Sequence, residues 1–454
     1  MSYTKAVAAF ARQKKYDKLS QELIDKVKKH LLDTIGCCIH GSGTAWAKIV
    51  ADYVICQGGR DEASLWLREF KGPANTVALA LGVMAHSYEL DDYHGGAKLH
   101  PGAVIIPAAI PVAEKLGSTG RDLICALIAG YEVMVRSSLA AGPLAARKRG
   151  WHLTGICGTL GAAAAVGCLM ELDEKRMAHA LGLAGTQSAG LFAFNCNGAD
   201  SKRFHPGRSA QSGVIAAELA DKGLTGPDEI YEFLDGGFCS AFSDAPKLEE
   251  LTRELNNDYV TKGVSIKPYA CCASTHSSID AIRDMVHMHQ IGPNDVKEII
   301  VYNHSIVKLQ TSWRYEPISP MQAQMNMEYC VAVALAEGNV GPDKFRADKI
   351  ADSKLVELAH KVRFEIDPEI EKIYPRSFPG RVAIRLNDGS TVEHKVSGPK
   401  GSPENPITLK EVEEKFFSLV DPIIGHAKAN KIVLQVGNIE QMGDMKSLIE
   451  VLSA

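Results

Sequence analysis

The stretch Leu153–Met170, LTGICGTLGAAAAVGCLM, decides the fold. It contains no charged residue and consists largely of alanine, glycine and small aliphatic side chains. Its length raises the question of a membrane span, but its glycine and alanine content makes it only weakly hydrophobic. Small side chains let the backbones of neighbouring helices approach closely. We therefore expect a tightly packed helix in the core of a protein, and no membrane partner.

The segments around this stretch indicate further helices. One begins after Ser20, carries apolar side chains at a period of 3.6 residues and ends near Gly41. Another ends at Gly117, and Thr119 can cap the next one. The remaining helices predicted before residue 240 cover 103–116, 119–135, 154–172 and 176–191. Together they indicate a compact core of many helices.

The pattern changes near residue 262. Val296–Tyr302 is typical of a strand, and Arg381–Val396 of a hairpin that turns at Asn387-Asp388-Gly389-Ser390. Helices are predicted nearby, over 277–288 and 323–336. This part of the chain indicates a smaller α+β unit.

Helix resumes after a segment rich in proline and glycine, 401–406. Thr408 and Glu411 form a capping box for it. If this last part packs back on the first, the α+β unit is an insertion. We predict a mainly α protein: a large helical domain built from residues 1–262 and 401–454, with an inserted α+β lid domain, 263–400. The cleft between them would hold the substrate.

Composition narrows the function classes. The net charge is −4 and the pI about 6.4, so no strong positive field exists to recruit nucleic acid. The eleven cysteines form no C-x-x-C pair, which favours free thiols in a reducing compartment. The N-terminal apolar run is short and soon followed by basic residues, unlike a signal peptide. We expect a cytoplasmic protein.

The segment from His86 to Gly102 concentrates proton-exchanging groups, among them Glu89, Asp91, Asp92 and His100. Three interpretations are open: a metal site, a solvated loop, or a site for proton transfer and substrate orientation. The order of the residues matches no metal-binding signature, so we predict no metal. A carboxylate beside an imidazole can fix its tautomer and raise its basicity, which favours the proton-transfer interpretation.

A second cluster is basic. Lys202, Arg203 and Arg208 lie within seven residues, together with His205. Arginine grips a carboxylate through two hydrogen bonds and lysine acts as a point charge, so the cluster suits a small anion. A solvated basic loop remains the alternative. Two further polar residues, His152 and Lys267, stand among mostly apolar neighbours and add to the candidate set, and His276 follows shortly after Lys267.

The sequence does not support an enzyme that transfers hydride, hydrolyses nucleoside triphosphates or uses a nucleophilic serine. The chain has no G-x-G-x-x-G turn, no Walker phosphate loop and no G-x-S-x-G nucleophile elbow. What remains is acid–base chemistry on a small anion without a cofactor.

Taken together, these motifs resemble those of the MmgE/PrpD family over nearly the whole chain. The matching motifs are His86 with Asp91-Asp92, His100-Pro101-Gly102, Gly150-Trp151-His152 with Thr154-Gly155, Lys202 with His205-Pro206-Gly207-Arg208, Lys267-Pro268-Tyr269 with Cys272 and His276, Tyr329, Asp388-Gly389, and Gly401 with Pro403 and Asn405-Pro406. The family includes 2-methylcitrate dehydratases, cis-aconitate decarboxylases and an iminodisuccinate epimerase. The resemblance implies a metal-free cleft between a helical domain and an inserted lid, and a homodimer.

The resemblance also implies site residues. The catalytic positions fall on Asp92, His100, His152, Lys202, Lys267 and Tyr329. Substrate-binding roles are expected for Glu89, Asp91, Tyr93, Arg203, His205, Arg208 and His276. Two residues depart from the family pattern: Glu89 replaces an aspartate, and Tyr93 stands where many members have threonine. Both changes would reshape the pocket.

These residues predict a cofactor-independent lyase for a small di- or tricarboxylic acid. Lysines would stabilise charge on a carbon–carboxylate unit, and His100 or His152 would move the proton. Tyr329 would deliver a proton, and the aspartates would orient histidines. Dehydration of a 2-methylcitrate-type substrate is our first hypothesis. Epimerisation of an aminodicarboxylate such as iminodisuccinate is the second, and decarboxylation of a cis-aconitate type the third. A non-catalytic protein that binds organic acids is the alternative from another class.

Overall fold

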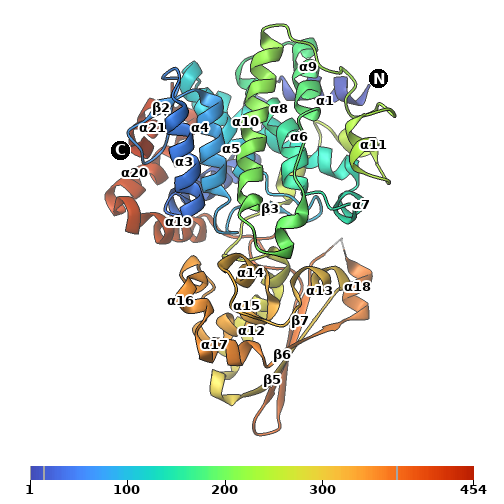
Figure 1. The fold of residues 1–454 in the computed structure, drawn as a ribbon, viewed down its shortest axis with the longest axis vertical. Helices are drawn as coiled ribbons and strands as arrows, with labels where there is room; N and C mark the ends of the chain where they lie inside the picture. The colour runs from blue at the N-terminus through green and yellow to red at the C-terminus, as the bar shows by residue number, and fades with distance from the viewer. Residues whose placement is uncertain (1, 14–15, 375–376, 454) are drawn as a thin grey trace.

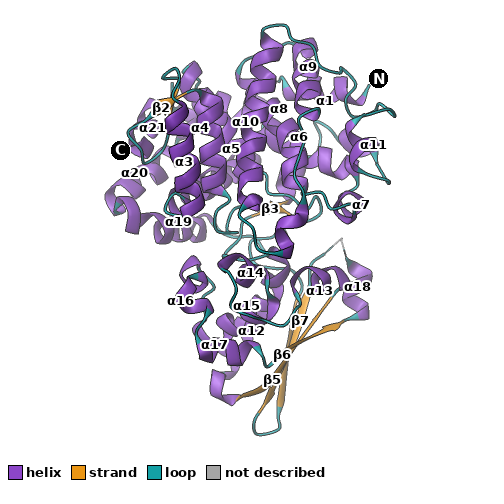
Figure 2. Cartoon of the chain, viewed as in Figure 1, coloured by secondary structure: helices purple, strands orange, loops and turns teal. Residues whose placement is uncertain are grey.

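The structure is a computed structural model that describes residues 2–13, 16–374 and 377–453. Helices make up 61% of it and strands 9%, which confirms the mainly α prediction. Figure 1 shows two parts, a helical body and a smaller α+β part below it, and Figure 2 shows that the long strands are confined to the smaller part.

The helical body takes most of its helices from the first half of the chain. They are α1 (Tyr3–Ala11), α2 (Gln21–Gly41), α3 (Ala45–Gln57), α4 (Ala74–Ala85), α5 (Gly102–Leu116), α6 (Gly120–Ala141), α7 (Pro143–Lys148), α8 (Leu153–Leu169), α9 (Glu174–Gly185), α10 (Ser201–Asp221) and α11 (Phe238–Phe242). Ser20 caps α2, and Thr119 forms a capping box with Asp122 at the start of α6, as local capping chemistry predicts.

Helix α8 lies at the centre of the body, and all of its residues are buried. It packs on α5, α6, α9 and α10. A Cβ atom added at Gly161 would lie 2.9 Å from the carbonyl oxygen of Gly130 in α6, so only glycine permits this close crossing. Helix α6 is long and apolar enough to cross a membrane, but 94% of its apolar window is buried inside the protein. It is a core helix of the body.

The C-terminal helices return to this body. They are α19 (Leu409–Ile424), α20 (His426–Gly437) and α21 (Lys446–Ser453). Figure 1 shows them in red beside the blue N-terminal helices, and α19 and α20 pack on α2. Thr408 and Glu411 form the predicted capping box of α19. The domain limits at 262/263 and 400/401 remain predictions.

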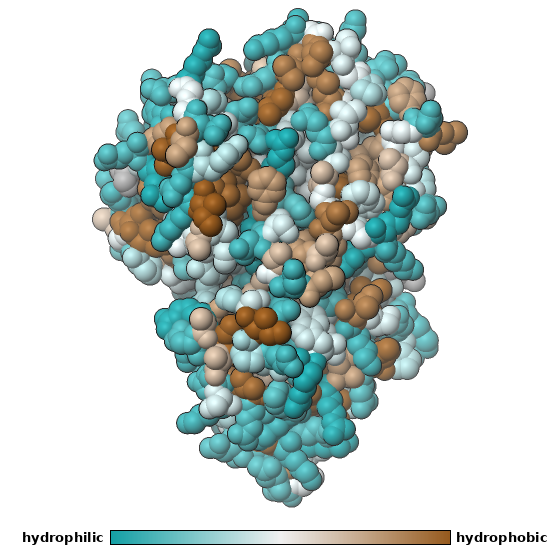
Figure 3. Space-filling model, in the orientation of Figure 1, coloured by the Kyte–Doolittle hydropathy of each residue, from teal (hydrophilic) through white to brown (hydrophobic). Residues whose placement is uncertain are grey.

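The α+β part is built around a four-stranded sheet in the order β6-β5-β7-β8. Its strands are β5 (Val296–Asn303), β6 (Val362–Ile366), β7 (Gly380–Leu386) and β8 (Thr391–Val396). Strand β5 pairs parallel with β6 and antiparallel with β7, and β7 pairs antiparallel with β8. Strand β5 and the hairpin β7–β8 match the sequence prediction, whereas β6 was not predicted. The outer tip of this part is hydrophilic in Figure 3.

Helices complete the α+β part. They are α12 (His276–His289), α13 (Ser305–Thr311), α14 (Pro320–Met325), α15 (Met327–Glu337), α16 (Ala347–Ile350), α17 (Ser353–Ala359) and α18 (Pro368–Ile373). Two-residue strands make short ladders elsewhere: β1 (Ala63–Ser64) pairs with β2 (Lys71–Gly72), and β3 (Tyr93–His94) with β4 (Val264–Ser265). The β3–β4 pair joins the segment from His86 to Gly102 to the part of the chain that leads into the α+β part.

Two sequence expectations differ from the structure in detail. The helix predicted over 176–191 ends at Gly185, and turns and a short 3-10 helix, Phe192–Cys196, follow. The basic cluster, for which a solvated loop was an alternative, begins the long helix α10, where Lys202 and Arg203 are buried. Packing of α10 on α4 and α8 stabilises a helix there despite Pro206 in its second turn.

Candidate active site

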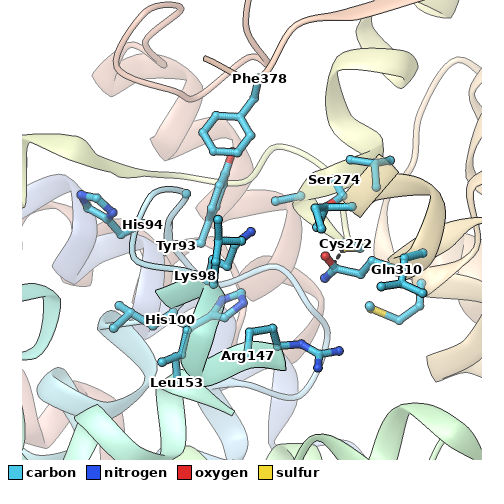
Figure 4. A pocket seen from close by; sticks show the side chains of 18 of the residues that line it. Tyr93, His94, Lys98, His100, Arg147, Leu153, Cys272, Ser274, Gln310 and Phe378 are labelled. Atoms are coloured by element: carbon cyan, nitrogen blue, oxygen red, sulfur yellow. Dashed lines mark hydrogen bonds between the residues drawn. The ribbon is translucent and has the colours of Figure 1, made fainter. Parts of the chain in front are cut away.

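A cavity of about 190 Å³ lies between the helical body and the α+β part. We call it the central cavity. The body contributes Glu89, Tyr93, Lys98, His100, Arg147, His152 and Lys202, and the other side contributes Lys267, Cys272, Ser274, Asn303, Gln310 and Phe378. Figure 4 shows Lys98, His100 and Arg147 on one side and Cys272 and Gln310 on the other. This volume suits a small metabolite.

Three cationic side chains surround the carboxylate of Glu89 at the wall of the cavity. Lys202 Nζ donates to Glu89 Oε1, Arg203 Nη1 lies 2.6 Å from the same oxygen, and Lys267 Nζ lies 3.4 Å from Oε2. All four side chains are buried. Burial alone would raise the pKa of the Glu89 carboxyl, but the three cations hold it well below its usual range. One negative charge thus faces three positive charges.

The excess of positive charge extends along the cavity. Among the described lining residues, Lys98, Arg147, Lys148, Lys202 and Lys267 are basic, and Glu89 is the one acidic residue. Burial lowers the pKa of Lys202, and it lowers that of Lys98 to about 8, because a cation out of water is penalised. A polyanionic ligand would neutralise this excess positive charge, since Coulomb attraction is strong where water is excluded.

A buried carboxylate orients the imidazole of His100. Asp91 Oδ2 lies 2.8 Å from Nδ1 of His86 and 3.2 Å from Nδ1 of His100. The backbone oxygen of Asp92 lies 2.9 Å from the same nitrogen of His100. Because a carbonyl oxygen only accepts hydrogen bonds, we assign the proton to Nδ1 of His100. The other nitrogen, Nε2, is then the atom that exchanges a proton with the cavity.

The charge state of Asp91 agrees with this role. Burial would raise the pKa of its carboxyl, but the two facing imidazoles hold the pKa well below its usual range. An ionised Asp91 can stabilise a positive charge on His100 when that ring is protonated.

His152 lies beside the same cavity, at the N-terminal end of α8. Its Nδ1 lies 2.9 Å from Nδ1 of His205 on α10, so one of these rings donates to the other. Burial, followed by the neighbouring His205 and Lys202, lowers the pKa of His152 well below its usual value. Burial also lowers that of His205 to about 4. Both rings are therefore neutral near pH 7.

Side-chain atoms of His86, Asp91 and His100 that could bind a metal lie within 4.8 Å of one another. Both imidazoles already turn Nδ1 toward the same carboxylate oxygen at hydrogen-bond distance. The three cations around neighbouring Glu89 also disfavour another cation here. The geometry fits a hydrogen-bonded relay better than a metal centre, and the absence of a metal stays a prediction.

Four sequence-predicted site residues lie elsewhere. The carboxylate of Asp92 accepts from Gly102 N and from the Tyr131 hydroxyl, both at 2.7 Å, behind the cavity wall. The hydroxyl of Tyr329 donates to the backbone oxygen of Lys344 at 2.6 Å. Arg208 is exposed and bonds Gln211, and His276 is buried beside Tyr269. None of the four lines the central cavity. We therefore leave them out of the set of residues that touch substrate.

The other nine predicted residues are brought together. Six of them line the central cavity: Glu89, Tyr93, His100, His152, Lys202 and Lys267. Asp91, Arg203 and His205 do not line it but contact His100, Glu89 and His152. Sequence reasoning gave no role to Arg147, Lys98 and Gln310. The signal for Arg147 was the run Arg147-Lys148-Arg149 directly before Gly150-Trp151-His152, but the run alone does not say which residue faces inward. In the structure, the Arg147 guanidinium stacks on Phe192 with 3.4 Å between its central carbon and the ring centroid.

Models of two domains match the chain: the MmgE/PrpD N-terminal domain over residues 5–251 and the MmgE/PrpD C-terminal domain over residues 269–441. The chain belongs to the MmgE/PrpD family. It is an enzyme of that family.

Curated relatives of this MmgE/PrpD enzyme match over almost their full length. The cis-aconitate decarboxylase-like protein oryM of Aspergillus oryzae is 30% identical, covering 95% of this chain and 93% of the relative. The cis-aconitate decarboxylase of Aspergillus terreus is 26% identical, covering 99% and 96%. That of Homo sapiens is 25% identical, covering 99% and 94%. The resemblance inferred from the motifs is confirmed at the level of the family.

Proposed function

We propose that this enzyme is a cofactor-independent decarboxylase of an unsaturated tricarboxylate of the cis-aconitate type. The names of the relatives favour decarboxylation, our third hypothesis, over dehydration. The observation that carries the proposal is the buried surplus of cations at Glu89 beside His100, which lines the cavity and bonds Asp91 and Asp92 through Nδ1. The surplus of cations suits a polyanionic substrate, and the histidine suits proton delivery to carbon.

The proposed step balances with the groups present. The bond to one carboxylate breaks and carbon dioxide leaves. The electron pair moves through the adjacent double bond to the carbon that bears another carboxylate, and that carbon takes one proton. Lys202 and Lys267, which line the cavity, lower the barrier by stabilising negative charge on this carbon–carboxylate unit, and Arg203 holds Glu89 from behind. The substrate's own negative charge favours a protonated His100, which delivers the proton from Nε2.

Proton NMR of the purified enzyme in D₂O tests the proposal. With cis-aconitate we expect new vinyl signals, release of carbon dioxide, and one deuterium in the product at the protonated carbon. Vinyl signals from 2-methylcitrate instead would establish a dehydratase. Deuterium entering an aminodicarboxylate without a change of skeleton would establish an epimerase. Binding without turnover across this panel would overturn the enzyme assignment at this site.

Arg147 is a candidate anchor for a second carboxylate. Within the described part of the chain its guanidinium has no hydrogen bond or ion pair, and it lines the cavity. Arg147→Gln is expected to raise KM for cis-aconitate about 10-fold or more, because a charge-assisted hydrogen bond contributes roughly 1.5–3 kcal/mol. We expect kcat to change little.

The matched control is Arg149→Gln. Arg149 is exposed, pairs with Asp244 and does not line the cavity, so its loss is expected to leave KM within about twofold. Steady-state kinetics on both variants checks the assignment. Equal KM values for Arg147→Gln and the unaltered enzyme would remove Arg147 from the site.

A further inference from the structure

The C-terminal helix α19 sends one charged side chain into the interior next to the site. Lys415 is 10% exposed, and its Nζ donates to Asp33 Oδ1 on α2 and, at 2.8 Å, to the backbone oxygen of Leu90. The neighbouring Phe416 packs against Gly36, where an added Cβ would lie 2.9 Å from the ring. The contact between α19 and α2 is therefore too close to let the lysine shift freely.

Leu90 lies between the two carboxylates that define the site, Glu89 and Asp91. Glu89 has a φ of +55°, a backbone region that L side chains rarely adopt. Such a conformation persists only when its surroundings hold it. Here Lys267 Nζ donates to the backbone oxygen of Glu89 at 2.9 Å, and Lys415 holds the next carbonyl. Two ammonium groups from distant parts of the chain thus hold consecutive peptide groups of this turn.

We propose that Lys415 is a positioning residue for catalysis. It does not touch the cavity. It acts by holding the Leu90 carbonyl, which fixes Glu89 among its three cations on one side and Asp91 against His100 on the other. The last helices of the chain thereby complete the active site of the first part, because among the described residues it is Lys415 that bonds this carbonyl.

The experiment separates this role from the ion pair itself. Lys415→Met alone would leave the Asp33 carboxylate buried without its cation, a change that unfolds proteins for reasons unrelated to the site. Asp33→Asn removes the negative charge, but its amide oxygen can still accept from Lys415 Nζ, whose charge also faces Asp91, so the ammonium group stays on Leu90. Asp33→Asn/Lys415→Met removes both. The comparison between these two variants isolates the contact with the Leu90 carbonyl.

Hydrogen exchange measured by mass spectrometry on the free protein is the first readout. The double variant is expected to exchange amides in residues 86–92 about tenfold faster than Asp33→Asn, while α19 stays protected. Asp33→Asn/Lys415→Gln keeps an N–H donor near Leu90 and is expected to restore part of the protection. If circular dichroism shows that Asp33→Asn/Lys415→Met does not fold, Asp33→Asn/Lys415→Gln is compared with Asp33→Asn instead. The glutamine variant is then expected to exchange amides in residues 86–92 faster than Asp33→Asn, but less than about tenfold faster.

Kinetics is the second readout and rests on the proposed function. On cis-aconitate, the double variant is expected to lose about 10–100-fold in kcat relative to Asp33→Asn, because a misplaced catalytic group costs this much, while KM changes less. Unchanged exchange in residues 86–92, or unchanged kcat with raised exchange, would overturn the proposal. An inactive unaltered enzyme would instead contradict the proposed function, and the exchange experiment would still decide the role of Lys415.

Discussion

Replacing Lys202 with methionine is expected to lower kcat/KM on cis-aconitate by about 10²–10³. Lys202 is one of two cations, with Lys267, that line the cavity and stabilise charge on the reacting carbon–carboxylate unit, and loss of one such donor has an effect of this size in other enzymes. Methionine has a similar length and fills the same buried space. Glu89 keeps Arg203 and Lys267 as partners, so the carboxylate is not left unpaired. We therefore expect the variant to fold.

Lys222→Met is the matched control for this variant. Lys222 caps the other end of the same helix, α10, and is exposed. Its loss is expected to leave kcat/KM unchanged within about twofold, since surface charges far from the site contribute little. Thermal unfolding of both variants shows whether the fold is kept. A folded Lys202→Met enzyme with nearly full activity would contradict the role given to the cation cluster.

The second large effect concerns His100. His100→Gln is expected to lower kcat by about 10²–10⁴, the usual contribution of a positioned proton donor. KM is expected to change less, because the cations that line the cavity, Lys202, Lys267 and Arg147, remain in place. The ratio of kcat in H₂O to kcat in D₂O, compared between the variant and the unaltered enzyme, checks that the proton-delivery step is the one that slows.

Tyr329→Phe provides the comparison for His100, because the two residues were predicted together as proton carriers. The hydroxyl of Tyr329 bonds the backbone of Lys344 away from the cavity. Its loss is expected to cost about 1 kcal/mol of unfolding free energy and to leave kcat nearly unchanged. A loss of kcat as large as that of His100→Gln would show that Tyr329 reaches the substrate, contrary to its place in this structure.

Local chemistry made much of the fold predictable. Ser20, Thr119 and Thr408 cap helices because an N-cap oxygen bonds a backbone N–H only a few residues away. The hairpin at 387–390 is equally local. The helical state of the basic cluster at the start of α10 was harder to predict, because Pro206 and Gly207 disfavour a helix. Packing of α10 against α4 and α8 outweighs that preference, and the sequence does not show this packing.

For the candidate site too, the sequence predicted some features, and others depend on tertiary structure. The types of residue in the motifs indicated acid–base chemistry on an anion. Six of the thirteen predicted residues line the central cavity, and three more contact these six. Which side of an element faces that cavity depends on tertiary structure. Asp92 is adjacent to Asp91 in sequence, yet its carboxylate points to Tyr131 and Gly102. Lys415 follows a run of glutamates on an amphipathic helix and had the pattern of a surface residue.

The surplus of positive charge around Glu89 has a consequence for turnover under the proposed reaction. A cis-aconitate-type substrate enters as a trianion, whereas carbon dioxide leaves as a neutral molecule and one proton is taken up. The organic product is therefore a dianion. The same fixed cations attract it less strongly than they attracted the substrate, since Coulomb energy scales with ligand charge. The reaction itself thus lowers the affinity of the site for the organic product, which favours its release.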